Sequence, residues 1–466
     1  MSLRMLVLLL AILPAFAADP LNGFDTFVQS AMQHLQVPGA AVGVMVDGKV
    51  VLAKGYGVRG VNERKPVTPA TLFATGSITK SFTATALASL VAEGKLDWDK
   101  PVREYLAWFR LYDPHASDLI TVRDMLTHRS GLPRYDAMRF LVRFPTEDLI
   151  RRLRYLPPSR SFREAWQYNN LMYVVAGYTG AQLAGTSYED LVIQRVFRPL
   201  GMTRSTMAVK ETQKTDDYAL PHLLRDGGPV EVPFYDYQSY GIGPNGAVNS
   251  TVEDLLRYLA FHLDGEERVL PRRQLDELHK PVLATGQGNT TYALGWNIDY
   301  RGGHHRIAHG GAITGFTASA MLYPGKRLAI IVLNNLGSTL PNLVAEELSD
   351  RFLGIQGPDR LAQLRAARPH RPSPPVAVPN TRPTLELAAY AGTYTHPALG
   401  DVRVETNGSG LKAVFSAATL ALRHHHFDTF QTDEGLARFT LDEQGRAARL
   451  YLPIESAMPP LEFIRR

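Results

Sequence analysis

Hydrophobic and polar positions follow a helical period at the start of the chain and a strand period directly after it. Apolar residues recur at helical spacing from Phe24 to Leu35, and Val37-Pro38-Gly39 then interrupts the pattern, which predicts an amphipathic helix. Two apolar runs at 40–46 and 49–56 flank Asp47-Gly48, a dipeptide typical of the tight turn in a β-hairpin. We therefore expect a helix packed beside an antiparallel hairpin.

The middle of the chain has the pattern of helices joined by short loops. Residues 77–91 are rich in Ala and Leu until Glu93-Gly94 supplies a stop, and a later helix is expected to begin just after Tyr168 and to end at Gly185. Further helical segments are predicted at 102–109, 121–128 and 146–154. Strand-like runs return at 293–300, 305–309, 317–323 and 328–333. These runs should complete the sheet that the hairpin begins. The prediction is an α/β (α+β) domain with an antiparallel sheet flanked by helices plus an all-helical region.

The C-terminal part of the chain has a different pattern. Six prolines between 367 and 383, with almost no apolar periodicity, predict a semi-rigid linker. Beyond them, short strand-like runs separated by turns predict a small antiparallel β-barrel or sandwich; they lie at 390–394, 402–404, 411–415, 427–430, 437–441 and 448–452. The expected organisation is a signal peptide at 1–18, a main domain at 19–357, a linker at 358–383 and a small β-barrel domain at 384–466.

The first 18 residues show the pattern of an export signal. Arg4 precedes an apolar run from Met5 to Leu13, and small residues lead to Ala17 and Ala18, where cleavage is expected. A membrane anchor is the alternative, but this run is too short to cross about 30 Å of hydrocarbon. The absence of cysteine is compatible with an oxidising compartment. We expect a periplasmic or secreted protein without a membrane span once the signal is removed.

The overall charge does not indicate a nucleic-acid partner. The net charge is +5 and the pI is near 9.2, but the basic residues are scattered among 45 acidic ones, with no basic run interleaved with aromatics. The run His424-His425-His426 suggests a metal site at first sight. Adjacent residues of a strand point to opposite faces, however, so the run does not present a chelating set, and we expect no metal site and no cofactor.

The strongest candidate for chemistry is Ser77 with Lys80. Three residues apart on a helix places them on one face, and a desolvated lysine amine can activate a serine hydroxyl as a nucleophile. The spacing alone is weak evidence, because Ser409 and Lys412 repeat it. The second pair follows the turn signature Asn407-Gly408 and should not share a helical face. Context therefore distinguishes the two pairs.

Two further polar clusters supply that context. Tyr168-Asn169-Asn170 lies at a loop-helix junction, and His309-Gly310-Gly311 lies at the edge of a predicted strand. In this order the three clusters resemble those of the penicillin-recognising serine hydrolases, in the class C β-lactamase-like group that includes D-amino-acid peptidases and esterases. The resemblance covers roughly residues 22–355. Residues 384–466 resemble the lipocalin-like domain that is often appended to such hydrolases.

The resemblance implies a role for each motif residue. Ser77 would attack a carbonyl, while Lys80, with a lowered pKa, and Tyr168 would share the proton transfers. Asn170 would position Lys80 and the substrate amide. The backbone N–H groups of Ser77 and Ala312 would form the oxyanion hole.

One motif position departs from the family pattern. His309 stands where β-lactamases usually carry lysine, beside the substrate-positioning Gly310 and Gly311. A mostly neutral histidine grips a substrate carboxylate less firmly than lysine does. We therefore expect cleavage of an amide in a small peptide, possibly one with D-amino acids, more than of antibiotics.

Several alternatives stay open at this point. The protein could be a carboxylesterase or a weak β-lactamase of the same fold, or a non-catalytic sensor that binds penicillins or peptides. It could form a homo-oligomer. The C-terminal domain could cap the cleft, mediate assembly or carry an apolar ligand.

Overall fold

An antiparallel sheet of eight strands joins the two ends of the main domain. The computed structural model describes residues 19–235, 241–366, 376–408 and 410–466, so the predicted signal peptide lies outside the described residues.

The strand order of the eight-stranded sheet is β2-β1-β12-β11-β10-β9-β8-β7. Its strands are β1 (Gly39–Val46), β2 (Lys49–Gly57), β7 (Leu283–Ala284), β8 (Thr291–Tyr292), β9 (Asn297–Arg301), β10 (His304–Ile313), β11 (Phe316–Tyr323) and β12 (Leu328–Asn334). The predicted hairpin therefore pairs directly with the last strand, in the register Val42↔Val332.

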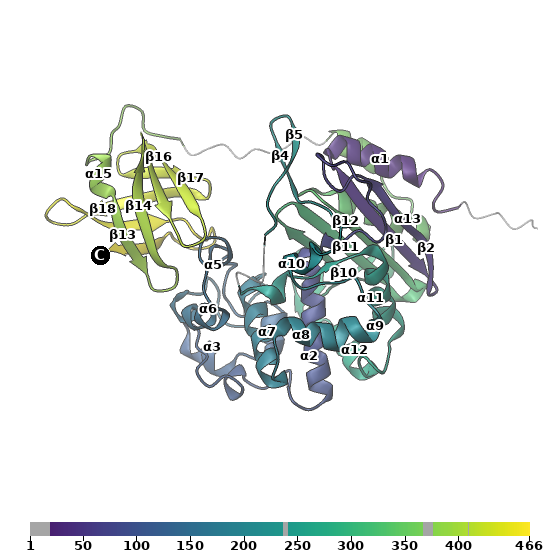
Figure 1. Cartoon of the computed structure of the whole chain (residues 1–466). Helices are drawn as coiled ribbons and strands as arrows, with labels where there is room; N and C mark the ends of the chain where they lie inside the picture. The colour runs from purple at the N-terminus through teal and green to yellow at the C-terminus, as the bar shows by residue number, and fades with distance from the viewer. Residues whose placement is uncertain (1–18, 236–240, 367–375, 409) are drawn as a thin grey trace, which may run out of the picture.

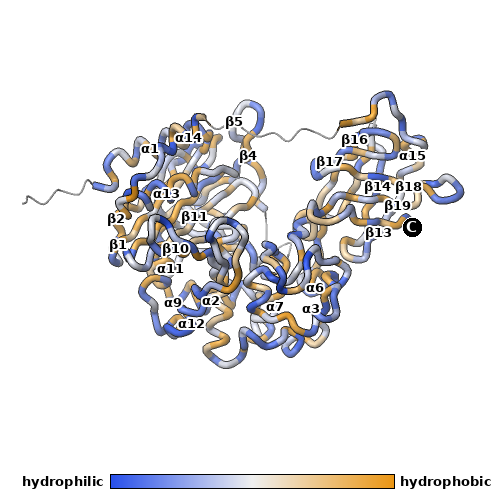
Figure 2. The backbone as a smooth tube through the Cα atoms, turned by 180° about the vertical axis from the view of Figure 1, so that it is seen from behind, coloured by the Kyte–Doolittle hydropathy of each residue, from blue (hydrophilic) through white to orange (hydrophobic). Residues whose placement is uncertain are grey.

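Helices cover both faces of this sheet because the side chains of its central strands alternate between two apolar clusters. Val42 and Val44 pack with α1 (Phe24–Leu35) and α13 (Leu340–Leu353). Ala41 and Met45 belong to the other cluster, which includes residues of α11 (Val252–Asp264). Figure 1 shows α1 and α13 on the outer side of the sheet and α11 toward the helical region. Apolar stretches gather inside the main domain and inside the barrel (Figure 2).

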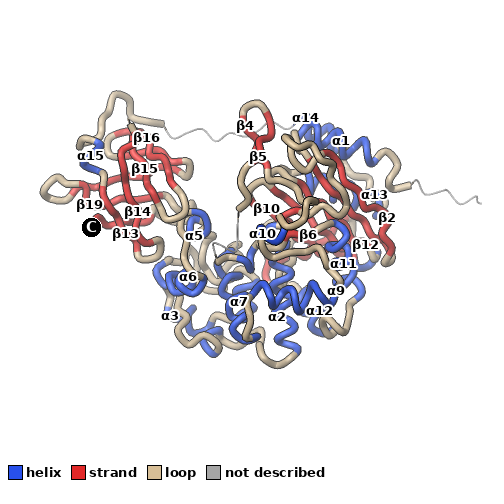
Figure 3. The backbone as a smooth tube through the Cα atoms, viewed as in Figure 1, coloured by secondary structure: helices blue, strands red, loops and turns tan. Residues whose placement is uncertain are grey.

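The helical region surrounds α2 (Thr79–Ala92), whose residues from Thr79 to Leu90 are all buried. It packs against α7 (Asn170–Ala184) and α12 (Arg272–Leu278), so it is a central helix with no face exposed to solvent from Thr79 to Leu90. The other helices of this region and its neighbours are α3 (Pro114–Leu119), α4 (Val122–Leu126), α5 (Ala137–Phe140), α6 (Thr146–Arg152), α8 (Tyr188–Val192), α9 (Arg198–Leu200) and α10 (Val209–Thr212). Figure 3 shows α2, α7, α9 and α12 below the sheet and α5 beside the barrel.

The C-terminal part forms a closed antiparallel barrel. Its strands are β13 (Gly392–His396), β14 (Gly400–Asn407), β15 (Gly410–Val414), β16 (Thr419–His426), β17 (Thr429–Thr432), β18 (Gly435–Leu441), β19 (Ala447–Leu452) and β20 (Leu461–Arg465). Pairing of Tyr394 with Arg465 closes it. Buried rings, among them Phe430, Phe439 and Phe463, fill its interior. The predicted fold class, a β-lactamase-like domain followed by a small β-barrel, is confirmed.

Some predicted helices are shorter than expected. The segment 102–109 contains a single 3-10 turn, Val102–Glu104, followed by further turns, and Val102, Leu106 and Phe109 are buried. The helix expected at 121–128 is α4, whose capping box of Thr121 and Asp124 sets its start. Among the described residues, no helix is long and apolar enough to cross a membrane.

The range predicted as a linker contains one helix. α14 (Arg360–Ala366) follows the main domain, and Arg360 donates to Glu347 and to Asp350 of α13. The small two-stranded elements β3 (Phe73–Ala74) with β6 (Asn249–Ser250) and β4 (His222–Arg225) with β5 (Gly228–Glu231), and the single-turn α15 (Leu387–Tyr390), complete the described elements. The β3–β6 pair matters for function because it leads directly into the turn that carries Ser77.

Candidate active site

Ser77 lies in a tight turn between β3 and α2. The turn is a 3-10 turn, Gly76–Ile78, and Gly76 has a φ of +53°, a backbone conformation that favours glycine. A Cβ on Gly76 would lie 2.7 Å from the backbone N of Ala312. Thr75 anchors the turn from the other side, because its Oγ1 donates to Val248 O at 2.9 Å. The nucleophile turn is thus held between β10 and the segment before β6.

Lys80 is fully buried one turn later, at the start of α2. Its Nζ lies 3.1 Å from Ser77 Oγ, 2.7 Å from Asn170 Oδ1 and 3.2 Å from Asn245 O. Burial and the positive charges of Arg139 and Arg134 hold the pKa of Lys80 well below its usual value, against an opposing effect of Asp136. The amine is therefore positioned and tuned to accept a proton from the serine hydroxyl.

Tyr168 approaches the same amine from the loop before α7. Asn169 caps that helix by accepting from Met172 N, and its own N–H donates to His128 Nδ1 at 3.0 Å. The Tyr168 ring packs on the buried His128 ring, with 4.4 Å between centroids, and its own centroid lies 4.7 Å from Lys80 Nζ. The helix start therefore places the phenol ring beside the Lys80 amine.

Strand β10 forms the opposite wall. His309 is buried, with Nε2 2.9 Å from the Tyr292 hydroxyl and Nδ1 2.6 Å from Gly310 O. A neutral ring satisfies both contacts, since Nδ1–H can donate to the carbonyl and Nε2 can accept from the hydroxyl. Burial, with a smaller effect of the Lys80 charge, lowers the pKa of His309 to about 4. The ring is therefore neutral at physiological pH.

The two glycines of this strand differ in their surroundings. A Cβ on Gly311 would lie 1.9 Å from Thr75 O and 3.2 Å from Ser77 N, whereas a Cβ on Gly310 would have no atom nearer than 3.7 Å. Glycine at 311 thus lets β10 lie directly against the nucleophile turn. This approach brings the strand that carries the Ala312 N–H to the turn that carries the Ser77 N–H.

An open cleft of about 390 Å³ connects these groups. Every side chain predicted from the motifs except the buried Lys80 lines it. The lining residues are Ser77, Arg134, Arg139, Tyr168, Asn170, His309, Gly310, Gly311, Ala312, Thr317, Ala318, Ser338, Pro341 and Asn342. The structure thus brings together all the predicted site residues.

Sequence patterns did not predict three charged residues of this site: Arg134, Asp136 and Arg139. Asp136 Oδ1 accepts from Asn170 Nδ2 at 2.9 Å and from Arg139 at 2.8 Å, and Oδ2 accepts from Arg134 Nε at 2.7 Å. The Arg134 guanidinium also stacks 5.0 Å from the centroid of the Tyr168 ring. These residues lie on a loop and a short helix without periodicity, so no pattern in the sequence indicated them.

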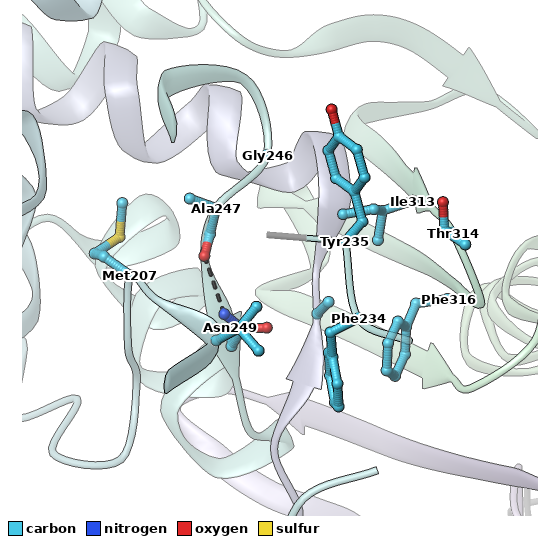
Figure 4. Close-up of a pocket in the computed structure, with 11 residues that line it drawn as sticks. Met207, Phe234, Tyr235, Gly246, Ala247, Asn249, Ile313, Thr314 and Phe316 are labelled. Atoms are coloured by element: carbon cyan, nitrogen blue, oxygen red, sulfur yellow. Dashed lines mark hydrogen bonds between the residues drawn. The ribbon is translucent and has the colours of Figure 1, made fainter. Parts of the chain in front are cut away.

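A small apolar pocket lies beyond the end of β10. Figure 4 shows Met207, Phe234 and Phe316 around it, together with Ile313, which directly follows Ala312. Two of the lining residues contact each other, since Asn249 Nδ2 donates to Ala247 O at 3.1 Å. Ala247 belongs to the loop that also supplies Asn245. The pocket therefore adjoins the oxyanion strand.

The run His424-His425-His426, for which no metal site is expected, lies at the end of β16. Within the part of the chain that the structure describes, no group of three His, Cys, Asp or Glu side chains is arranged to hold a metal ion. The second Ser-x-x-Lys pair is partly visible: Lys412 lies on β15 and pairs with Glu405 at 2.9 Å, whereas Ser409 lies outside the described residues.

Comparisons with known proteins show what the chain is similar to. Residues 24–352 match the Beta-lactamase family, and residues 376–463 match a domain of unknown function (DUF3471). The unguisins hydrolase ungD' of Aspergillus campestris is 28% identical over 82% of this chain and 77% of its own length. Protein flp of Staphylococcus aureus is 25% identical over 72% of this chain and 67% of its own length.

Among solved structures, the octameric penicillin-binding protein homologue from Pyrococcus abyssi is similar over most of the chain. It has a TM-score of 0.67 and 26% identity, and the match covers 92% of this chain and 96% of that one. A class C β-lactamase has a TM-score of 0.61 and 23% identity over 74% of this chain and 99% of its own, which shows the shared fold. The chain belongs to the Beta-lactamase family. It is a serine hydrolase of that fold.

Proposed function

We propose that this protein hydrolyses an amide bond of a small peptide through an acyl-enzyme on Ser77. The observation that carries the proposal is the contact between Ser77 Oγ and the Lys80 amine at 3.1 Å, with the lysine fully buried and its pKa depressed. A buried, neutral amine within hydrogen-bond reach of a hydroxyl is what activates a serine at neutral pH.

The proposed reaction follows from the positions of the groups. Ser77 Oγ bonds to the substrate carbonyl carbon as its proton passes to Lys80, and the N–H groups of Ser77 and Ala312 stabilise the resulting oxyanion. The carbon–nitrogen bond then breaks, and the leaving amine takes a proton through Tyr168. Water, activated by Tyr168 and Lys80, attacks the ester, releases the acid and restores the Ser77 hydroxyl.

We favour a peptide over an antibiotic as substrate because of the residue at position 309. His309 is buried and neutral, so the position where β-lactamases usually carry lysine provides no cation for a carboxylate. The Aspergillus relatives are named hydrolases of unguisins, which supports hydrolysis. A D-stereospecific amidohydrolase from Streptomyces is among the similar solved structures, so peptides containing D-amino acids are the first class to test.

A fluorophosphonate probe with intact-mass detection tests the nucleophile. Wild type should gain one adduct, Ser77→Ala should gain none, and Ser409→Ala, which removes the serine of the second Ser-x-x-Lys pair, should label like wild type. An unlabelled wild type, or equal labelling of Ser77→Ala, would refute the proposal. Turnover of D-alanyl amides, p-nitrophenyl esters and penicillins then separates peptidase, esterase and β-lactamase activity.

We also propose export and self-association. Export is supported by the signal-like pattern of residues 1–18, and its test is the N-terminal sequence of the protein recovered from the periplasm or medium of a bacterial host. Self-association is supported by the similar Pyrococcus homologue, which is octameric. Light scattering of the purified protein should give a mass above 51.6 kDa, and a monomer mass would contradict it.

A further inference from the structure

The segment from Pro133 to Arg143 lies between the active site and the C-terminal barrel. It includes α5, and Figure 1 shows α5 at the foot of the barrel. We call residues 133–143 the bridging segment. One side of it contacts Tyr168 and Asn170, and the other side contacts the barrel. It is therefore a direct physical connection between the two.

The barrel holds the bridging segment through its backbone. The Glu455 carboxylate accepts from Tyr135 N at 2.7 Å, Ala417 N donates to Leu141 O at 3.0 Å, and Ser416 Oγ accepts from Arg143 N at 2.9 Å. The first contact is charge-assisted, which makes it the strongest of the three. Both ends of the segment are thus attached to strand connections of the barrel.

Tyr135 adopts a conformation that requires such support. Its φ is +44°, a left-handed backbone conformation that bulky residues rarely adopt, and its side chain is fully buried. Glu455 holds its N–H, and Pro157 O accepts from its hydroxyl at 2.7 Å. An unfavourable backbone conformation persists only where surrounding contacts over-determine it. Without Glu455, the segment loses one of the contacts that determine this turn.

The same turn places Asp136 against Asn170. Because the Asp136 carboxylate accepts from Asn170 Nδ2, the amide must present its other end, Oδ1, to the Lys80 amine. A rotated amide would put its oxygen against the carboxylate and its NH₂ against the ammonium or amine. Pro133 O also accepts from Asn169 Nδ2 at 2.5 Å, so the segment supports both asparagines of the motif.

We propose that the C-terminal barrel is a positioning element of the active site, in which Glu455 holds the bridging segment so that Asp136 fixes the orientation of the Asn170 amide and hence of Lys80. The inference rests on the proposed function only for its kinetic readout. Asp136 and Glu455 are positioning residues, since neither of them lines the cleft.

Three full-length variants test this path. Glu455→Ala should slow fluorophosphonate labelling of Ser77 and kcat for p-nitrophenyl acetate by about tenfold to hundredfold, with little change in KM, because a displacement of about 1 Å misaligns the reacting groups. Glu455→Gln, which keeps an acceptor for Tyr135 N–H, should restore most of the rate. Glu462→Ala is the matched control, because Glu462 contacts only the barrel residues Arg449 and Tyr451 in the described contacts. It should behave like wild type.

A double-mutant cycle tests whether the two carboxylates act through one path. Asp136→Asn alone should slow labelling, and adding Glu455→Ala should slow it little further, whereas Glu462→Ala should leave the Asp136→Asn rate unchanged. Full multiplication of the Glu455→Ala and Asp136→Asn effects would overturn the inference. So would a wild-type rate for Glu455→Ala.

Hydrogen exchange gives a readout that does not depend on catalysis. In Glu455→Ala, amides of 133–143 and of 168–171 should exchange faster than in wild type, while amides of α2 should not change. If Glu455→Ala does not fold, Ser416→Ala removes a second barrel contact and should speed exchange in the same two regions. Unchanged exchange at 168–171 would overturn the inference even if Ser77 were never labelled.

Discussion

The contact between β10 and the nucleophile turn gives the sharpest single prediction. The change is Gly311→Ala, and the control is Gly310→Ala on the neighbouring residue of the same strand. Ordinary contact begins at 3.4 Å, so the new methyl group at 1.9 Å from Thr75 O requires a shift of about 1.5 Å, which is 3.4 minus 1.9. The methyl group of Gly310→Ala would meet nothing nearer than 3.7 Å and requires no shift.

The expected loss of acylation rate in Gly311→Ala follows from the backbone atoms that the new methyl group displaces. Thr75 O is a backbone atom two residues before Ser77, and Ser77 N itself lies only 3.2 Å from the added carbon. Any movement that relieves the clash therefore shifts the Ser77 N–H relative to β10, which carries the Ala312 N–H of the oxyanion hole. Losing one such donor costs about 2.7–4 kcal/mol, or about a hundredfold to a thousandfold in rate. Overpacking should also lower the free energy of unfolding by about 1–3 kcal/mol.

Two measurements on each variant check this reasoning. The time course of fluorophosphonate labelling reports the acylation rate, and urea unfolding reports the free energy of unfolding. Gly311→Ala should lose rate and stability together, while Gly310→Ala should keep wild-type stability and label within a few-fold of wild type. If Gly311→Ala labels as fast as Gly310→Ala, the close approach of β10 does not set the oxyanion geometry.

Four further predictions concern single groups of the site. Lys80→Met should slow Ser77 labelling by about 10²–10⁴-fold, the usual contribution of a positioned base, and a rate within tenfold of wild type would contradict that role. Because only the free amine accepts a proton and the pKa of Lys80 is depressed, wild-type kcat/KM should fall as pH drops through an inflection well below 10.5; a profile with its inflection near 10.5 would contradict the depressed pKa. Tyr168→Phe should accumulate acyl-enzyme in intact-mass spectra, which unimpaired ester turnover would exclude. His309 has a pKa of about 4 in the fold against 6.5 when unfolded, so the unfolded state binds more protons between these values and the free energy of unfolding decreases as the pH is lowered. From pH 8 to pH 5 this ring should remove about 2 kcal/mol from the free energy of unfolding, a loss that urea unfolding should find absent in His309→Gln.

Much of the fold could be predicted because its signals are local. The turn at Asp47-Gly48 has left-handed φ values of +48° and +74°, the conformation that this dipeptide favours in a two-residue hairpin. Strands β16 and β20 were missed. In β20 only Leu461 and Phe463 face the core, and β16 is mostly half-buried, so neither has a long enough alternation to stand out.

Those parts of the site that lie within a single helix could be predicted from the sequence. The spacing of Ser77 and Lys80 and the start of α7 after Asn169 follow from helix geometry. The meeting of Lys80 with Asn170, 90 residues away, does not follow from any pattern, and only the family resemblance indicated it. The buried environment that lowers the pKa of His309 was likewise beyond the reach of the motif, which showed only the residue type.

The bridging segment shows why the remaining part could not be predicted. Its contacts join loops that are distant in sequence: Asp136 and Asn170 are 34 residues apart, and Tyr135 and Glu455 are 320 apart. The loops that carry Tyr135 and Glu455 have no hydrophobic periodicity in their sequence. The packing of other elements around each loop sets its position. Every motif residue lies before position 313, so a comparison of motifs assigns the chemistry to the main domain alone. If Glu455 holds Tyr135 as proposed, the barrel contributes to acylation without any residue in the cleft, and removing residues 384–466 should slow acylation while leaving all the motif residues in the chain.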